Sequence, residues 1–155
     1  MSSDEFINIY TDGSCINNGR SDATASIGIW IQQFPDMSIS ERITSYPQTN
    51  QVAELYAIKR ALETADNFEK INIFTDSKYA MNCVTQWCLK WEKNNWKTSK
   101  GKSPINMDLI KEIIIKLRSM RSIGKIISFT YVPGHSGHEG NEAAHRSAMN
   151  ASRSG

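Results

Sequence analysis

The sequence has 155 residues, of which 39% are hydrophobic and 22% are charged, and its net charge is +2 at pH 7. This length and composition predict one globular domain over residues 1–155. No apolar run approaches the ~20 residues that span a bilayer, and Met-Ser-Ser-Asp-Glu at the start lacks the basic and apolar regions of a signal peptide. We therefore expect an intracellular protein, cytoplasmic or nuclear, that is a monomer and has no membrane partner.

Charge is distributed unevenly along the chain. Residues 90–125 include ten Lys or Arg and three Asp or Glu, a net charge of +7 that leaves −5 for the remainder. Such a basic block is typical of proteins that bind a polyanion, because Lys and Arg displace counterions from phosphates. A solvated basic helix face would give the same pattern, so charge alone leaves both explanations open.

Hydrophobic periodicity predicts the secondary structure in chain order. A strand at 6–11 is followed by a loop at 13–22, strands at 25–31 and 39–45, and a helix at about 52–65. A strand at 71–75 and a helical region at 77–89 then precede a Lys-rich exposed excursion at 91–104. The chain ends with a helix at 107–120, a strand at 126–132, a helix at 140–151 and a frayed tail at 152–155.

The order of these elements predicts an α/β fold. Short connections make strands one to three antiparallel, whereas a β-helix-β link back into the same sheet makes strand four parallel to strand one. The last strand closes the sheet, so we expect a mixed five-stranded sheet with strands one, four and five parallel and helices on both faces.

Three carboxylates are expected at one edge of this sheet. Asp12 follows the first strand, Asp76 follows the fourth, and Glu54 lies early in the helix between them. Open α/β sheets bind ligands at the carboxyl ends of parallel strands. Carboxylates so close together need a cation to neutralise them, and an all-oxygen set favours Mg²⁺ or Mn²⁺ over zinc.

Each carboxylate also has an ordinary structural explanation. Asp12 and Gly13 could form a turn, Asp76 could cap a helix that starts at Ser77, and Glu54 could complement the helix dipole in a first turn. These alternatives stay open for each residue alone, but they do not predict that all three meet at one edge.

Four segments occur in an order and approximate spacing that resemble a known family. They are Tyr-Thr-Asp12-Gly-Ser, Thr-Asn-Gln-Val-Ala-Glu54-Leu, Phe-Thr-Asp76-Ser and Pro-Gly-His135-Ser-Gly-His-Glu-Gly-Asn-Glu-Ala-Ala. The family is the cellular type 1 ribonucleases H, which cut the RNA strand of RNA·DNA hybrids. The resemblance implies the ribonuclease H-like fold and two Mg²⁺ ions bound by Asp12, Glu54 and Asp76, with Asp12 bridging them. It also implies endonucleolytic hydrolysis that leaves 5′-phosphate and 3′-hydroxyl ends, and a His135 that assists proton transfer or product release.

The same resemblance implies residues that bind the hybrid. Those for RNA 2′-hydroxyls and base edges are Asn18, Asn50 and Gln51. A basic protrusion at about 87–104 would hold the DNA strand through Trp87, Lys97, Ser99 and Lys102. Thr49 and Asn106 match members of a DNA-phosphate pocket, whose usual Arg is Pro47 in this chain.

One position departs from the family pattern. Where the family reads Gly-Asn-Glu-x-Ala-Asp, this chain reads Gly-Asn-Glu-Ala-Ala-His145, so an imidazole replaces the fourth carboxylate ligand. Mg²⁺ takes imidazole poorly and Mn²⁺ takes it more readily. We therefore expect His145 to be a metal ligand of an active enzyme in which Mn²⁺ substitutes for Mg²⁺ with an unusually high relative rate.

Two other functions are compatible with these residues. The chain could be a hybrid-binding domain whose catalysis is impaired by His145, which predicts binding without turnover. It could also be a ribonuclease H domain excised from a reverse transcriptase, because those polyproteins carry the same fold.

Overall fold

Five strands form one mixed sheet in a computed structural model that describes residues 5–134 and 137–153. The strands are β1 (Ile7–Ile16), β2 (Thr24–Ile31), β3 (Ile39–Arg42), β4 (Lys70–Thr75) and β5 (Ile126–Tyr131). Their order is β3-β2-β1-β4-β5, with β2 antiparallel to β1 and β3, and β4 parallel to β1 and β5. The predicted strand directions are confirmed.

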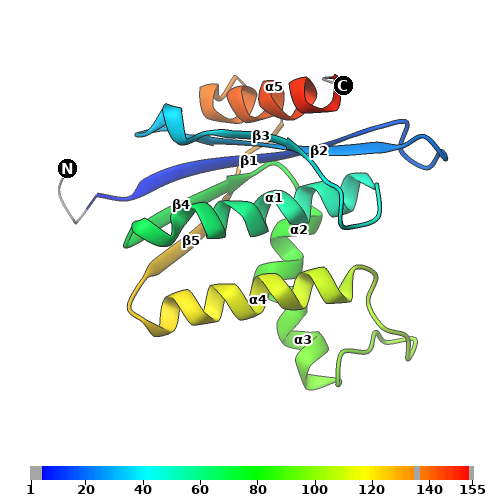
Figure 1. The fold of residues 1–155 in the computed structure, drawn as a ribbon. Coiled ribbons are helices and arrows are strands. Elements are labelled where there is room, and N and C mark those ends of the chain that lie inside the picture. The colour runs from blue at the N-terminus through cyan, green and yellow to red at the C-terminus, as the bar shows by residue number, and fades with distance from the viewer. Residues whose placement is uncertain (1–4, 135–136, 154–155) are drawn as a thin grey trace.

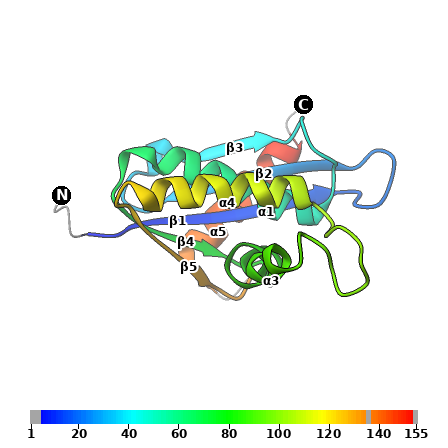
Figure 2. The same cartoon turned by 90° about the horizontal axis from the view of Figure 1, so that it is seen from below.

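Helices cover both faces of this sheet, as predicted (Figure 1). The helices are α1 (Asn50–Thr64), α2 (Lys78–Asn82), α3 (Cys88–Lys93), α4 (Met107–Ser122) and α5 (Glu139–Arg153). Helix α5 packs on β1, β2 and β3 from one side, while α1 packs on β1 and β2 from the other and α4 stacks on α1. Figure 2 shows α4 in front of the sheet and α5 behind it. Within the described residues, no helix combines the length and the apolar character needed to cross a bilayer.

The core lies between the sheet and α1. Buried isoleucines of β1, β2 and β4 point toward this helix. On α1, the side chains that pack against them are Val52, Leu55, Ile58 and Leu62, each 0–1% exposed. The alternation of the strands and the helical spacing of α1 bring these side chains to one layer.

Two glycines let helices approach the central strands very closely. A Cβ on Gly13 of β1 would lie 2.5 Å from the α1 backbone at Ala53 and Glu54. Gly28 of β2 pairs with Asp12. A Cβ on Gly28 would overlap the backbone carbonyl of Ala144 in α5. Because no side chain intervenes, the α1 backbone contacts one face of the sheet next to Asp12, and the α5 backbone contacts the opposite face.

Strand boundaries differ from the prediction by more than one residue in two places. The predicted loop from Gly13 to Asp22 is wrong at its start, because residues 13–16 pair with residues 24–27 and extend β1 to Ile16. The third strand ends at Arg42, not at Ser45. Pairing with a neighbouring strand decides where a strand ends, and the polar composition after Asp12 conceals it.

Helix boundaries also differ. The helical region that follows β4 passes through a π-helical turn, η3 (Cys83–Trp87), and continues to Lys93, so the exposed excursion begins after α3, not at Trp91. The predicted frayed tail is wrong for residues 152–153, which belong to α5. Ser152 is 5% exposed and donates to the hydroxyl of Ser26, and Arg42 donates to the carbonyls of Ala151 and Ser152, each at 2.9 Å. Residues 154–155 lie outside the described residues.

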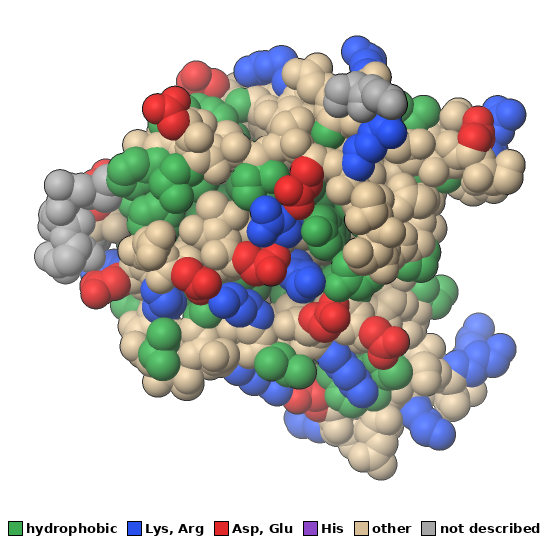
Figure 3. Space-filling model, viewed as in Figure 1, with side chains coloured by type: hydrophobic (Ala, Val, Ile, Leu, Met, Phe, Trp, Pro, Cys, Tyr) green, Lys and Arg blue, Asp and Glu red, His purple; other side chains and the backbone are tan. Residues whose placement is uncertain are grey.

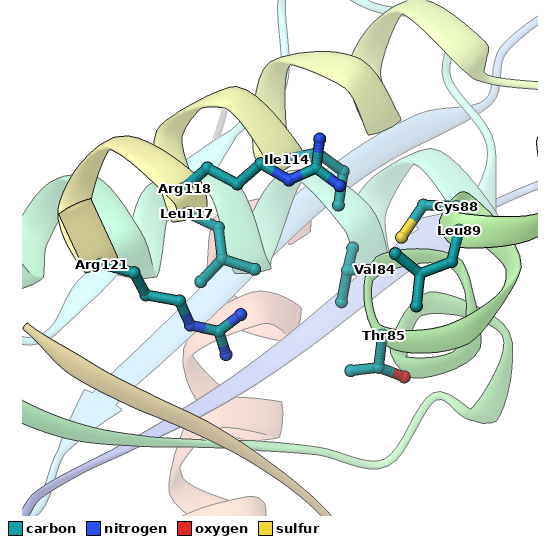
Figure 4. A pocket seen from close by; sticks show the side chains of 8 residues that line it. All are labelled: Val84, Thr85, Cys88, Leu89, Ile114, Leu117, Arg118 and Arg121. Atoms are coloured by element: carbon teal, nitrogen blue, oxygen red, sulfur yellow. The ribbon is translucent and has the colours of Figure 1, made fainter. Parts of the chain in front are cut away.

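The basic block divides into two parts with different environments. The first part lies on α4 and just after it. Arg118 of α4 pairs with Glu92 of α3 at 2.6 Å, and Arg121 of α4 donates to the Ile127 carbonyl of β5 at 2.6 Å. Both arginines border a cavity of about 260 Å³ that lies between α4 on one side and η3 and helix α3 on the other (Figure 4). Lys116 pairs with Asp66, and the ammonium of Lys125 donates to two carbonyls near β4. These cations therefore hold structural elements together.

The second part of the basic block is exposed. Its lysines lie on α3 and the loop that follows it, and none forms an ion pair within the part of the chain that the structure describes: Lys90, Lys93, Lys97, Lys100 and Lys102. In Figure 3, Lys or Arg side chains gather at the lower right, over the loop between α3 and α4. These five lysines are therefore available to a polyanion.

Candidate metal and nucleic-acid site

Asp12 and Asp76 lie side by side at the same edge of the parallel part of the sheet. Parallel pairing between β1 and β4 ends at Thr11 opposite Thr75, and each aspartate is the next residue. Asp12 remains inside β1, where it pairs with Gly28 of β2. The predicted proximity of the two aspartates is confirmed, although Asp12 does not end its strand.

Glu54 reaches this edge from α1. The hydroxyl of Thr49 caps the helix by accepting from the Val52 amide at 3.1 Å. Glu54 lies one turn further along, and the Gly13 amide donates to its Oε1 atom. One oxygen atom from each of Asp12, Glu54 and Asp76 lies within 4.8 Å of the other two. The three carboxylates therefore converge.

The ordinary explanations for these residues do not hold. Asp12 and Gly13 are in a strand and not a turn. Ser77, and not Asp76, caps α2 by accepting from the Ala80 amide at 3.0 Å. The first turn of α1 has no acidic residue, so Glu54 does not serve the helix dipole there. These three alternatives therefore do not account for the convergence.

Burial makes this cluster costly to ionise. Asp12 is 3% exposed and Glu54 is 8% exposed. Burial raises the pKa of Asp12 to about 6, and the charge of Asp76 contributes, while the hydrogen bond with His145 acts in the opposite direction. Burial and the charges of Asp12 and Asp76 raise the pKa of Glu54 well above its ordinary value. A divalent cation would relieve this repulsion, and the all-oxygen donor set fits Mg²⁺ or Mn²⁺.

His145 contacts the cluster from α5. Its Nδ1 atom lies 2.7 Å from Oδ2 of Asp12, and its side chain is 38% exposed. Among the described residues, the group of converging ligand atoms contains the three carboxylates and not the imidazole. His145 is therefore a hydrogen-bond partner of Asp12 in this structure, and its service as a metal ligand stays a prediction. His135 lies outside the described residues, and its role stays a prediction as well.

Asn141 is a site residue that the sequence reasoning missed. Its Nδ2 atom donates to Oδ2 of Asp76 at 3.3 Å, and the residue is 3% exposed. It stands four residues before His145, so both side chains leave the same face of α5. That spacing was visible in the sequence, but only the docking of α5 shows that this face meets the carboxylates.

Several residues predicted to bind the hybrid lie together. The side chain of Asn18 accepts from the Asn50 amide at 3.2 Å, which joins the loop after β1 to the start of α1. A cavity of about 350 Å³ is lined in part by Gln51, Trp87 and Lys102. A second cavity, of about 340 Å³, is lined in part by Trp87, Lys97 and Ser99. Trp87 thus joins the two cavities into one surface beside the exposed lysines.

One residue of the predicted DNA-phosphate pocket, Asn106, lines a cavity. Asn106 lines a third cavity, of about 520 Å³, together with Pro47 and the acidic Asp108. The amide of Asn106 donates to the Tyr79 hydroxyl at 3.0 Å, and Thr49 is not among the residues that line this cavity. The pairing of Thr49 with Asn106 in a DNA-phosphate pocket stays a prediction.

Comparison with known proteins identifies the family. The family model for RNase H matches residues 4–153, which is nearly the whole chain. This chain belongs to the RNase H family. Ribonuclease H1 of Homo sapiens is 39% identical over 151 residues, which cover 96% of this chain and 51% of that protein. Ribonuclease H of Blochmanniella pennsylvanica is 35% identical over 147 residues, which cover 95% of this chain and 92% of that protein.

The relatives named Ribonuclease H1 support the identification of this chain as a type 1 RNase H. This chain spans about half the length of those first relatives. Among solved structures, a chain of the foamy viral protease-reverse transcriptase in complex with dsDNA superposes with a TM-score of 0.78 at 24% identity. It covers 97% of this chain and 96% of that one. The likeness confirms the ribonuclease H-like fold.

Removal of the Asp12 charge should stabilise the metal-free RNase H domain at neutral pH. The folded protein holds a proton on Asp12 more tightly than the unfolded chain does, because the pKa rises from 3.8 to about 6. The corresponding stability is complete below pH ~4 and is lost as the pH rises through ~6. We expect Asp12→Asn to raise the free energy of unfolding by ~1–3 kcal/mol at pH 7.5 in EDTA and by little at pH 4.

Urea unfolding at the two pH values measures this difference. Asp36→Asn makes the same chemical change at an exposed position and serves as the control. An Asp12→Asn effect that is equal at both pH values would contradict the electrostatic explanation.

Proposed function

We propose that this chain is a metal-dependent endonuclease that hydrolyses the RNA strand of RNA·DNA hybrids. The observation that carries the proposal is the convergence of the buried Asp12 and Glu54 with Asp76, at the point where the parallel pairing of β1 and β4 ends. Its support is the family membership, because relatives that are 31–39% identical over most of this chain are named ribonuclease H or H1. We also propose that the protein acts as a monomer.

Asp12, Glu54 and Asp76 would hold two Mg²⁺ ions, with His145 as a further proposed ligand. When bound, the ions lower the pKa of the attacking water and stabilise the leaving 3′-oxygen, which gives 5′-phosphate and 3′-hydroxyl ends. Asp12 and Glu54 are held by the backbone contacts of β1 and α1, so the protein supplies a preorganised set of oxygen donors. His135 is proposed to assist proton transfer or product release.

The hybrid is proposed to lie across the α1 N-terminus and the loop between α3 and α4. Asn18, Asn50 and Gln51 would contact RNA 2′-hydroxyls, which distinguish RNA from DNA. The DNA strand would contact Trp87, Lys97, Ser99 and Lys102, with Thr49 and Asn106 near a phosphate. The shared cavities of Gln51, Trp87 and the lysines support one continuous nucleic-acid surface.

The decisive experiment is cleavage of a labelled RNA·DNA hybrid with Mg²⁺ or Mn²⁺. Single-stranded RNA, duplex RNA and duplex DNA are compared at the same concentration. We expect cutting of the RNA strand of the hybrid alone, none in EDTA, and a loss of roughly 1,000-fold or more in Asp12→Asn, because the variant removes a proposed metal ligand.

Asp36→Asn again serves as the control and should retain full activity. Hybrid binding without cutting under either metal would overturn the proposed activity and favour the alternative of a hybrid-binding domain.

Salt dependence should separate the two parts of the basic block. Each lysine that neutralises a phosphate adds ~0.9 to the slope of log affinity against log salt. We expect Lys97→Ala and Lys102→Ala each to lower the slope for hybrid binding by ~1 in an Asp12→Asn background. Lys116→Ala is the matched control, because its ammonium is occupied by Asp66. An equal loss of slope in Lys116→Ala would contradict the division of the basic block into exposed lysines that bind phosphate and cations that are paired within the fold.

Replacement of His145 with Asp should change both metal preference and stability. The variant substitutes a fourth carboxylate for the hydrogen-bond partner of Asp12. We expect the ratio of the Mn²⁺ rate to the Mg²⁺ rate to fall, and the metal-free protein to lose ~1–3 kcal/mol of stability at pH 7.5.

His145→Asn introduces neither a carboxylate nor an imidazole, and it separates the effect of the added negative charge from that of losing the imidazole. An unchanged metal ratio in His145→Asp would exclude a role of the imidazole in metal preference.

A further inference from the structure

Asn141 is buried where α5 meets the edge of the sheet that carries the carboxylates. It belongs to the first turn of α5, is 3% exposed, and donates through Nδ2 to Oδ2 of Asp76 at 3.3 Å. A buried amide in a helix could simply satisfy a backbone group. Here its partner is instead one of the three converging carboxylates.

Asp76 has little support from its own element. It lies between the end of β4 and Ser77, which caps α2, and it is the most exposed of the three carboxylates. A Cβ on Gly134 would lie 3.0 Å from its Oδ2 atom, so Gly134 leaves space for this oxygen without holding it. The orientation of the Asp76 carboxylate therefore depends on groups that come from elsewhere in the fold.

Helix α5 is well placed to supply such a group. Its backbone contacts the sheet at Gly28, and Gly140, the residue before Asn141, packs directly on the ring of Tyr10. At the other end of the helix, Arg42 donates to the carbonyls of Ala151 and Ser152. Because the helix is fixed at both ends, the amide of Asn141 has a defined position relative to Asp76.

We propose that Asn141 is a positioning residue that orients Asp76 for binding a divalent cation. The inference rests on the proposed metal-dependent function of the carboxylate cluster. An amide N–H binds one carboxylate oxygen without adding charge, which leaves the other oxygen, and the second lone pair of Oδ2, for the cation. A carboxylate at position 141 would add repulsion, and an apolar side chain would remove this hydrogen bond to Asp76.

Metal binding by itself tests the proposal. The dissociation constant of Mn²⁺ is measured by titration calorimetry on the metal-free protein, without nucleic acid. We expect Asn141→Leu, which keeps the size but loses the donor, and Asn141→Ala, which loses both, to weaken Mn²⁺ binding by ~10-fold or more. Asn141→Ser, which restores a small donor, should recover part of the affinity.

Controls separate positioning from general damage. Asn150→Leu makes the same change at an exposed position of α5 and should bind Mn²⁺ as the unmodified protein does. Thermal unfolding of each metal-free variant reports folding; if Asn141→Leu does not fold, Asn141→Ala carries the test. In hybrid cleavage, the rate constant kcat should fall at low metal concentration and recover at high metal concentration, with KM for the hybrid unchanged.

Asp76→Asn makes the two possible failures distinguishable. If Asp76→Asn weakens Mn²⁺ binding and a folded Asn141→Leu or Asn141→Ala variant does not, the positioning role is overturned and the metal site stands. If Asp76→Asn also leaves Mn²⁺ affinity unchanged, the carboxylate cluster is not the metal site, and both the proposed function and this inference fail.

Discussion

The site depends on how closely two helices approach the central strands of the sheet. Gly13 admits the backbone of α1 against β1, and Gly28 admits the backbone of α5 against β2. These contacts bring Glu54 from one face and His145 from the other to the level of Asp12. A side chain at either glycine would move a helix outward, and the polar groups that meet at this edge would separate.

This close packing has an electrostatic cost. Burial and mutual repulsion raise the pKa of Asp12 to about 6 and that of Glu54 well above its ordinary value. The same arrangement destabilises the metal-free cluster, and a divalent cation bound there would relieve the repulsion. Hydrogen bonds donated by Gly13 and Asn141, and the hydrogen bond between His145 and Asp12, offset part of the cost while they fix the carboxylates in place.

The surface around the site separates structural charge from available charge. Arg118, Arg121, Lys116 and Lys125 each contact a group on a neighbouring element, so their charges contribute to the fold. The exposed lysines of α3 and the loop that follows it flank the cavities that Trp87 joins. A net charge computed over the whole segment could not show this division, because it depends on which partner each cation meets.

The sequence by itself determined the elements that local patterns encode. Alternating isoleucines predict the strands, the spacing of Val52, Leu55, Ile58 and Leu62 predicts α1, and the β-helix-β connection predicts that β1 and β4 are parallel. Asp12, Glu54 and Asp76 could therefore be placed at one edge before any coordinates, because strand direction and helix phase follow from residues close in sequence.

Only the tertiary structure decided what depends on residues far apart in the chain. Pairing with β2 extends β1 to Ile16, and contact with Ser26 and Arg42 keeps Ser152 helical and buried. The same is true of the face that α5 turns toward the site, where Asn141 meets Asp76 and His145 meets Asp12. Periodicity shows that a helix has a polar face, but the partner of that face is set by packing between distant segments.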